Sequence, residues 1–134
     1  MIIGLGSDIT NISRFERSLQ AYGHKLLQRI LGPAEQQELS ALKNVSPQEY
    51  AAFVAKRFAA KEACSKALGT GFRNGIYLKD IQTVHNKLGK PELVLSDGAL
   101  QQLHNLGQGQ TLRLHLSLSD DYPWAQAFVI IEII

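Results

Sequence analysis

The sequence predicts an α+β fold in which antiparallel strands pack against one long helix. Apolar residues follow a helical period in the first half of the chain and alternate as in strands in the second half. The longest regular segment is a helix over residues 47–68, and the chain ends in two strand-like segments joined by a tight turn. A length of 134 residues fits a single domain, residues 1–134.

The first part of the chain predicts a short strand followed by three short helices. Met1–Leu5 is an apolar run that ends at Gly6. The helices are expected over residues 11–22, 24–31 and 33–42. Gly23 separates the first two, and Pro33 suits the first position of the third because no helical N–H is needed there.

The long helix has clear signals at both ends. Ser46 to Glu49 form a capping box with Pro47 at the first helical position, and Gly69 is a natural stop. The remaining elements are strands over residues 77–84 and 92–96, a helix over 98–106, and strands over 111–119 and 125–134. Strict alternation places four leucines on one face of the 111–119 strand: Leu112, Leu114, Leu116 and Leu118.

The last strand, residues 125–134, is apolar on both faces. A strand in the middle of a sheet would show this pattern, and so would a strand that another subunit covers. Because the protein is small, we expect oligomerisation to explain it.

Composition limits the class of protein. Fourteen basic and twelve acidic side chains give a net charge of +2, which is too small to indicate a nucleic-acid binder. The single cysteine, Cys64, cannot form an internal disulfide, which favours a reducing cytoplasm. The N-terminal residues lack the pattern of a signal peptide, and no apolar run reaches the roughly 18 residues of a membrane span. We expect a cytoplasmic protein with no nucleic-acid or membrane partner.

The last turns of the long helix hold four charged residues although the helix has no wide polar face. Arg57 and Lys61 fall in the arc of large apolar side chains, whereas Glu62 and Lys66 fall in an arc of alanines. One interpretation is structural. Glu62 and Lys66 then form an i, i+4 pair worth about 0.2–0.5 kcal/mol, and the two basic stems are buried with their charged ends in water. The other interpretation is a binding site.

Short motifs occur in a defined order along the chain. Residues 57–71 read RFAAKEACSKALGTG, and residues 4–9 read GLGSDI, with Arg14 after them. Three further motifs follow: Asp80-Ile81, Gly89-Lys90-Pro91 and Ser117-Leu118-Ser119. In these motifs the sequence resembles the holo-acyl-carrier-protein synthase family, the small bacterial 4′-phosphopantetheinyl transferases, over the whole chain. The resemblance implies the α+β fold of that family.

The resemblance also implies a reaction. The 4′-phosphopantetheine arm of coenzyme A moves to a serine of apo acyl carrier protein, adenosine 3′,5′-bisphosphate is released, and the product serves fatty acid and lipid biosynthesis. Such a transfer requires neutralised phosphate charge, a stabilised leaving phosphate and removal of the serine proton. Mg²⁺ suits the first two requirements, because it prefers a few carboxylates together with phosphate oxygens and water.

Residues that match the family's motifs take their expected roles from it. Asp8 and Glu62 match the metal ligands and are expected to hold Mg²⁺. Glu62 is also expected to orient or deprotonate the serine, directly or through water, and Lys66 to meet a phosphate or the leaving group. The expected catalytic residues are Asp8, Glu62 and Lys66. The expected coenzyme A contacts are Arg57, Lys61, Lys66, Gly69, Gly71, Lys90, Pro91 and Ser117.

The protein substrate of this family is acidic, so a basic docking surface is expected. Four basic residues of the first two predicted helices form a candidate rim: Arg14, Arg17, Lys25 and Arg29. An ordinary charged helix face is the alternative for all of them except Arg14, which lies in a motif. The family is typically a homotrimer with active sites shared between subunits. Asp8 of one chain is then expected to work with Glu62 of a neighbour.

One position departs from the family's pattern. Many members carry His shortly after Ser-x-Ser, where it assists the nucleotide phosphates, whereas this chain has Asp120 and Asp121. Arg113 or Arg73 is a candidate replacement.

Two other functions are compatible with parts of the sequence. One is a non-catalytic oligomeric module that binds coenzyme A or acyl carrier protein, and the other is a weak nucleic-acid binder with a steep salt dependence. Asp8 and Glu62 argue against both, since a phosphate-binding surface gains from carboxylates only when a cation lies between.

Overall fold

The computed structural model describes all residues, 1–134, and confirms the α+β class. In chain order the elements are β1 (Ile2–Asn11), α1 (Ile12–Tyr22), α2 (His24–Ile30), α3 (Pro33–Ser40), α4 (Pro47–Ala67), the 3-10 helix η1 (Leu78–Asp80), β2 (Ile81–His85), β3 (Pro91–Leu95), α5 (Asp97–Gly107), β4 (Leu112–Asp121) and β5 (Trp124–Ile133). None of the helices combines the length and apolarity that a membrane crossing requires.

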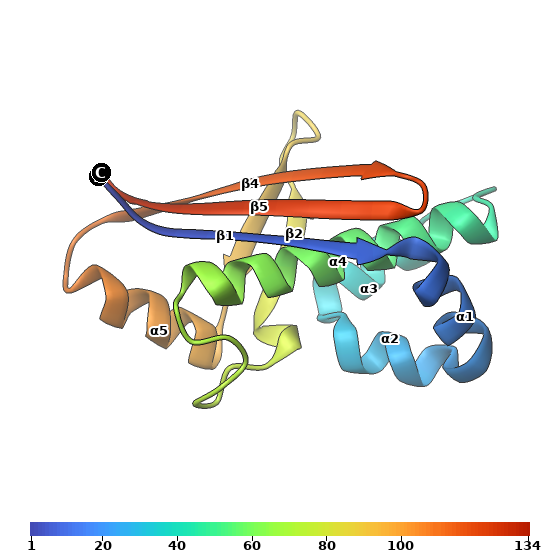
Figure 1. Cartoon of the computed structure of the whole chain (residues 1–134), viewed down its shortest axis with the longest axis horizontal. Coiled ribbons are helices and arrows are strands. Elements are labelled where there is room, and N and C mark those ends of the chain that lie inside the picture. The colour runs from blue at the N-terminus through green and yellow to red at the C-terminus, as the bar shows by residue number, and fades with distance from the viewer.

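Strands β1, β5 and β4 form one antiparallel sheet in that order, and the helices lie on one side of it (Figure 1). The long helix α4 packs along this side against β1 and β5. Strands β2 and β3 form a separate antiparallel hairpin, of which β3 contacts β4. The two chain ends lie side by side, because Met1 and Ile133 exchange backbone hydrogen bonds.

Strand β1 is longer than the sequence predicts, because Gly6 does not end it. The strand continues through Ser7 and Asp8 to Asn11. The Asn11 side chain then accepts a hydrogen bond from the backbone N–H of Ser13 and caps α1. The longer strand carries Asp8 along the flank of α4.

The glycines of β1 are explained by a close approach to α4. A Cβ at Gly6 would run into the backbone carbonyl of Ala63, and a Cβ at Gly4 would run into that of Ala67. Only a strand without side chains at these two positions can lie so close to the helix. This contact sets the distance between Asp8 and the last turns of α4.

Helix α4 begins and ends as predicted. The Ser46 hydroxyl accepts the backbone N–H of Glu49, and Gly69, with a φ of 86°, follows the end of the helix. The core has two parts along this helix. Its C-terminal half packs with the sheet, the hairpin and α5, and its N-terminal half packs with α1, α2 and α3.

Besides the end of β1, two strand boundaries differ from the prediction by more than one residue. The strand expected from Tyr77 begins only at Ile81, because the Asp80 carboxylate accepts the backbone N–H of Tyr77 and holds residues 78–80 in a 3-10 turn. Strand β4 extends beyond Ser119 to Asp121, since pairing with β5 continues to that residue.

The two apolar faces of β5 have different surroundings. β5 is the central strand of its sheet, and Ala125, Ala127, Val129 and Ile131 are buried on its inner face. No helix covers the outer face, where Leu5 is 64% exposed, Ile9 60% and Phe128 45%. The central position therefore accounts for only one of the two apolar faces.

Candidate active site

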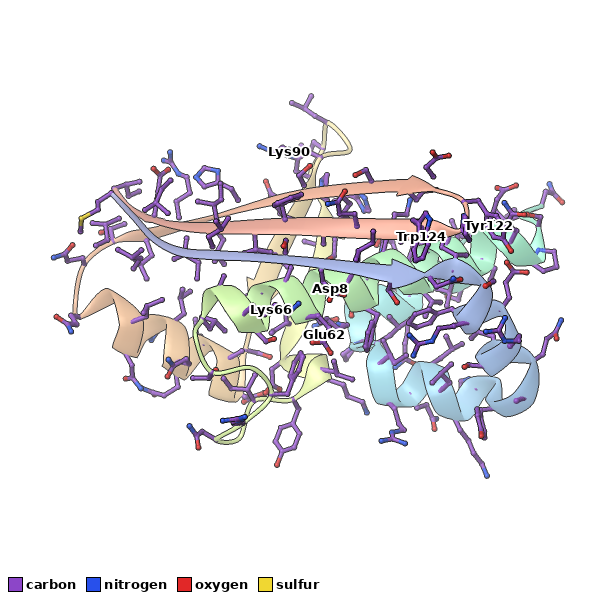
Figure 2. The ribbon with its side chains drawn as sticks, in the orientation of Figure 1. Asp8, Glu62, Lys66, Lys90, Tyr122 and Trp124 are labelled. Carbon is purple, nitrogen blue, oxygen red and sulfur yellow. The ribbon has the colours of Figure 1, made fainter.

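Asp8, Glu62 and Lys66 meet within one chain, at the edge where β1 passes the last turns of α4. The Lys66 ammonium donates to the Ser7 carbonyl at 2.9 Å and to Asp8 Oδ1 at 3.2 Å. Glu62 lies one helical turn before Lys66, and Figure 2 shows the three side chains close together. The expectation that Asp8 works with Glu62 of a neighbouring subunit is corrected, because a single chain brings both carboxylates together.

The electrostatics of this cluster favour an added cation. Partial burial raises the pKa of Glu62, the nearby Asp8 carboxylate raises it further, and Lys66 opposes them. Nowhere does the chain gather three or more His, Cys, Asp or Glu side chains that could hold a metal. A pair of carboxylates fits Mg²⁺, since this ion commonly takes its remaining ligands from substrate phosphates and water. Asp8 and Glu62 are therefore the residues that would hold it.

The turn after α4 is open beside this cluster. Gly69 has a φ of 86° and Gly71 a φ of 61°, so both lie in the left-handed region that favours glycine. The backbone N–H of Gly71 donates to the Ser65 carbonyl, which folds the turn back on the helix. No atom lies within 4 Å of a Cβ built at either glycine, so a ligand has space to approach the backbone.

Lys61 does not belong to this site, although it precedes Glu62 in the sequence. Its side chain is 0% exposed, and its ammonium donates to the Glu35 carboxylate and to the Ile81 carbonyl. Burial lowers the pKa of Lys61, and the Glu35 carboxylate opposes this effect. The expected phosphate contact is therefore wrong for Lys61, and so is the alternative that its charged end reaches water.

Arg57 is also directed into the protein. Its guanidinium carbon lies 3.7 Å from the centre of the Phe53 ring, and Nη2 lies 3.4 Å from Glu38 Oε2. Burial lowers the pKa of Arg57, and Glu38 opposes this effect. With its side chain only 4% exposed, Arg57 has a structural role in place of the expected contact with coenzyme A.

Lys90, Pro91 and Ser117 lie away from the carboxylates. Figure 2 shows Lys90 at the end of the β2–β3 hairpin, far from Asp8 and Glu62. Ser117 is exposed on β4, two strands away from β1 in the register of the sheet. Apart from the buried Arg57 and Lys61, the expected coenzyme A residues of one chain therefore form two groups. Lys66, Gly69 and Gly71 belong to the end of α4 beside β1, and Lys90, Pro91 and Ser117 lie on the β4 side of the sheet.

The expected docking residues are all exposed on α1 and α2: Arg14, Arg17, Lys25 and Arg29. Arg29 also lines a cavity of about 600 Å³ together with Arg73 and Lys79 of the segment that follows the glycine turn. No acidic side chain lines this cavity, whereas Phe72 and Tyr77 do. Lys79 was not predicted from the sequence, because it lies just outside the Asp80-Ile81 motif and only the fold brings it to Arg29.

Asp120, which departs from the family's pattern, forms an ion pair with Lys56 of α4 at 3.0 Å. Lys56 was not predicted from the sequence either, since only the fold brings the end of β4 to this helix. The candidate replacement Arg113 lies at the other end of β4, and Arg73 lies in the cavity beside α2. Lys56 is therefore the basic side chain that accompanies Asp120 in this chain.

Comparison with known proteins decides the family. A model of the 4′-phosphopantetheinyl transferase superfamily matches residues 4–127. The chain belongs to this superfamily. This match, together with whole-chain relatives at 47% identity, confirms the holo-acyl-carrier-protein synthase family expected from the sequence motifs.

Similar phosphopantetheinyl transferases match the chain from end to end. A holo-acyl-carrier-protein synthase of Sphingopyxis alaskensis is 47% identical over 135 residues, which cover 100% of this chain and 98% of that protein. The crystal structure of the Neisseria meningitidis holo-acyl-carrier-protein synthase has a TM-score of 0.81 at 39% identity and covers 98% of this chain and 99% of its own. A Bacillus anthracis synthase in complex with CoA (3′,5′-ADP) has a TM-score of 0.78 at 35% identity and covers 100% and 99%.

Proposed function

We propose that this protein is a holo-acyl-carrier-protein synthase that transfers the 4′-phosphopantetheine group of coenzyme A to a serine of apo acyl carrier protein. The second product is adenosine 3′,5′-bisphosphate, and the modified carrier serves fatty acid biosynthesis. The observation that carries this proposal is the meeting of Asp8, Glu62 and Lys66 within one chain, beside an open glycine turn and an exposed basic rim. The cytoplasmic location inferred from the sequence stays a prediction.

The chemistry assigns a role to each of the three side chains. The serine oxygen forms a bond to the phosphorus, and the bond between that phosphorus and the departing adenosine 3′,5′-bisphosphate oxygen breaks. Glu62, whose pKa is raised by burial and by Asp8, is suited to take the serine proton. Lys66 is half exposed and supplies positive charge to the departing phosphate. When bound by Asp8 and Glu62, Mg²⁺ would neutralise diphosphate charge.

The acidic carrier fits the basic surface next to this cluster. The exposed side chains of Arg14 and Arg17 on α1 follow the strand that carries Asp8. The cavity lined by Arg29, Arg73 and Lys79 adds further positive charge without any acidic neighbour in its wall. A surface of this kind steers an anionic partner toward the site and raises its association rate.

A homotrimer would reunite the two groups of coenzyme A residues. One chain holds Asp8 and Glu62 at the β1 edge and Lys90 at the far side of β4, so a ring of copies can place one group against the other. The outer face of the sheet, with Leu5, Ile9 and Phe128 exposed, offers the apolar surface for such an interface.

The transferase activity is tested by incubating the protein with coenzyme A, apo carrier and Mg²⁺, followed by mass spectrometry of the carrier. A mass gain of one phosphopantetheine group is expected, and it should disappear on chelation and in Asp8→Ala and Glu62→Ala. A protein that binds coenzyme A but leaves the carrier unmodified would instead be the non-catalytic module.

The oligomer is tested by light scattering of wild type and Phe128→Lys, with Leu100→Lys on α5 as a control that places the same charge at another exposed apolar position. Phe128→Lys is expected to yield monomers with little activity although Asp8 and Glu62 are intact. A wild-type monomer that is fully active would reject the shared site.

A further inference from the structure

The β2–β3 hairpin is held at its base in the core, by contacts of β3 with β4, and by contacts of β2 with α3 and α4. It shares no backbone ladder with the three-stranded sheet, and its base is held by Ile81 and Leu95 in the apolar core. Its other end, the turn over residues 86–90, projects past β4, and Leu88 there is 94% exposed (Figure 1). The position of the turn therefore depends on whatever holds the hairpin between base and turn.

Two polar clusters hold β2 along its length. In the inner cluster the buried Glu35 carboxylate of α3 accepts from Lys61 and from the backbone N–H of Thr83, while Lys61 also donates to Ile81. Both charged side chains are 0% exposed. Each charge has a partner, so this cluster ties α3, α4 and the base of the hairpin together.

The outer cluster repeats this arrangement one turn along both helices. Arg57 precedes Lys61 by four residues on α4, Glu38 follows Glu35 by three on α3, and His85 ends β2. Glu38 Oε1 lies 2.6 Å from His85 Nδ1, and Glu38 Oε2 lies 3.4 Å from Arg57 Nη2. His85 is the last residue of β2 that contacts the helices in this way before the turn.

The turn itself is internally rigid, so it moves with His85. The Asn86 side chain accepts the backbone N–H groups of Leu88 and Lys90, and the backbone N–H of Asn86 donates to the Lys90 carbonyl. His85 pairs with Pro91 across the two strands. A shift of His85 would therefore displace Lys90 and Pro91 together.

We propose that Glu38, Arg57 and His85 are positioning residues for coenzyme A, because they fix the end of the hairpin that presents Lys90 and Pro91. This inference rests on the proposed function, in which these two residues contact coenzyme A. Preorganised contacts lower the cost of binding, so loosening the outer cluster weakens coenzyme A binding. Within one chain the hairpin lies away from Asp8 and Glu62, so a loosened hairpin leaves the geometry of these two side chains unchanged, and the chemical step keeps its rate.

The test compares Glu38→Gln and His85→Ala with wild type in steady-state kinetics at saturating apo carrier. KM for coenzyme A is expected to rise about tenfold while kcat stays within about twofold, the pattern of a lost binding contribution. Glu49→Gln, which makes the same chemical change at an exposed position of α4, should leave both constants unchanged.

The outcomes separate this inference from the function on which it rests. Wild-type protein that leaves the carrier unmodified rejects the proposed function before any variant is compared. Active wild type together with an unchanged KM for coenzyme A in Glu38→Gln and His85→Ala overturns the positioning role. A parallel fall of kcat and melting temperature in Glu38→Gln also overturns it, because it would show that the cluster serves stability alone.

Discussion

Lys61 and Glu62 are neighbours in the sequence, yet they leave α4 in directions about 100° apart and have different surroundings. Lys61 is directed into the interior, where Glu35 and a backbone carbonyl satisfy its charge. Glu62 is directed toward Asp8 at an open edge, where the only positive charge that opposes its raised pKa is that of Lys66. One side of the helix thus has its charges balanced, and the other side has an excess of negative charge.

This difference separates a structural charge from a functional one. A buried charge that has all its partners contributes to the arrangement of elements but has no capacity left for a ligand. A pair of carboxylates whose negative charge is not fully balanced readily binds an added cation. The comparison predicts that changes on the inner side reduce stability and changes on the open side reduce activity.

The largest expected effect is on the inner side. Lys61→Met should lower the free energy of unfolding by about 3–5 kcal/mol, because it leaves the Glu35 carboxylate buried without its ion partner. Urea unfolding followed by circular dichroism measures this loss. The double variant Lys61→Met/Glu35→Gln should recover much of it, since no unpaired charge is left. Equal stability of Lys61→Met and wild type would show that this pair is not buried as described.

On the open side, Asp8→Asn should lower kcat by about 100- to 1,000-fold, the usual effect of removing one group that stabilises charge at the reaction centre. The melting temperature should change little, because Asp8 lies at the edge of the fold and its proposed role is to hold Mg²⁺. The mass gain of the carrier is followed over time. Asp97→Asn, an exposed change of the same kind in the first turn of α5, is the control and should keep wild-type turnover.

The close contact between β1 and α4 is tested by a substitution at Gly6. Gly6→Ala should lower stability by about 1–3 kcal/mol, because the new methyl group would run into the Ala63 carbonyl and push β1 away from α4. Turnover should fall as well, since Asp8 moves with the strand. Ser7→Ala, whose side chain is exposed on the same strand, is the control. If Gly6→Ala matches that control in thermal unfolding and turnover, close packing does not position Asp8.

The smallest effect concerns the pH dependence of stability in the absence of divalent ions. Because the pKa of Glu62 is raised, the folded protein keeps this proton to a higher pH than the unfolded chain, in which the pKa is about 4.3. The stabilisation is present at low pH, falls as the pH rises through this window and is lost above the raised pKa. Glu62→Gln removes this dependence and should be slightly more stable than wild type at neutral pH. The pH dependence is measured from the melting temperatures of wild type and Glu62→Gln between about pH 4 and about pH 8. Parallel curves for these two proteins would contradict the prediction.

Much of the fold was predictable because its signals are local. The side-chain cap at Ser46 and Gly69 bound α4 as expected, and the four alternating leucines of β4 lie on the inner face of the sheet. The boundary at Gly6 was wrong for a reason that is not local. A glycine in a strand pattern indicates either an end or a close approach of another backbone, and only the packing of α4 shows that it is the second.

Of the candidate site, the sequence by itself determined the motifs and the family, and with them the three side chains that converge, since short motifs keep residue identity and spacing. Only the tertiary structure decided which charges are available to a ligand. It buried Arg57 and Lys61, paired Asp120 with Lys56, placed Lys90 away from Asp8, and put Ser117 on a strand separated from that of Asp8 by β5. The physical reason is that the partner of a charge is chosen by proximity in space, and the partners here, Glu35, Glu38 and the end of β4, come from distant parts of the chain.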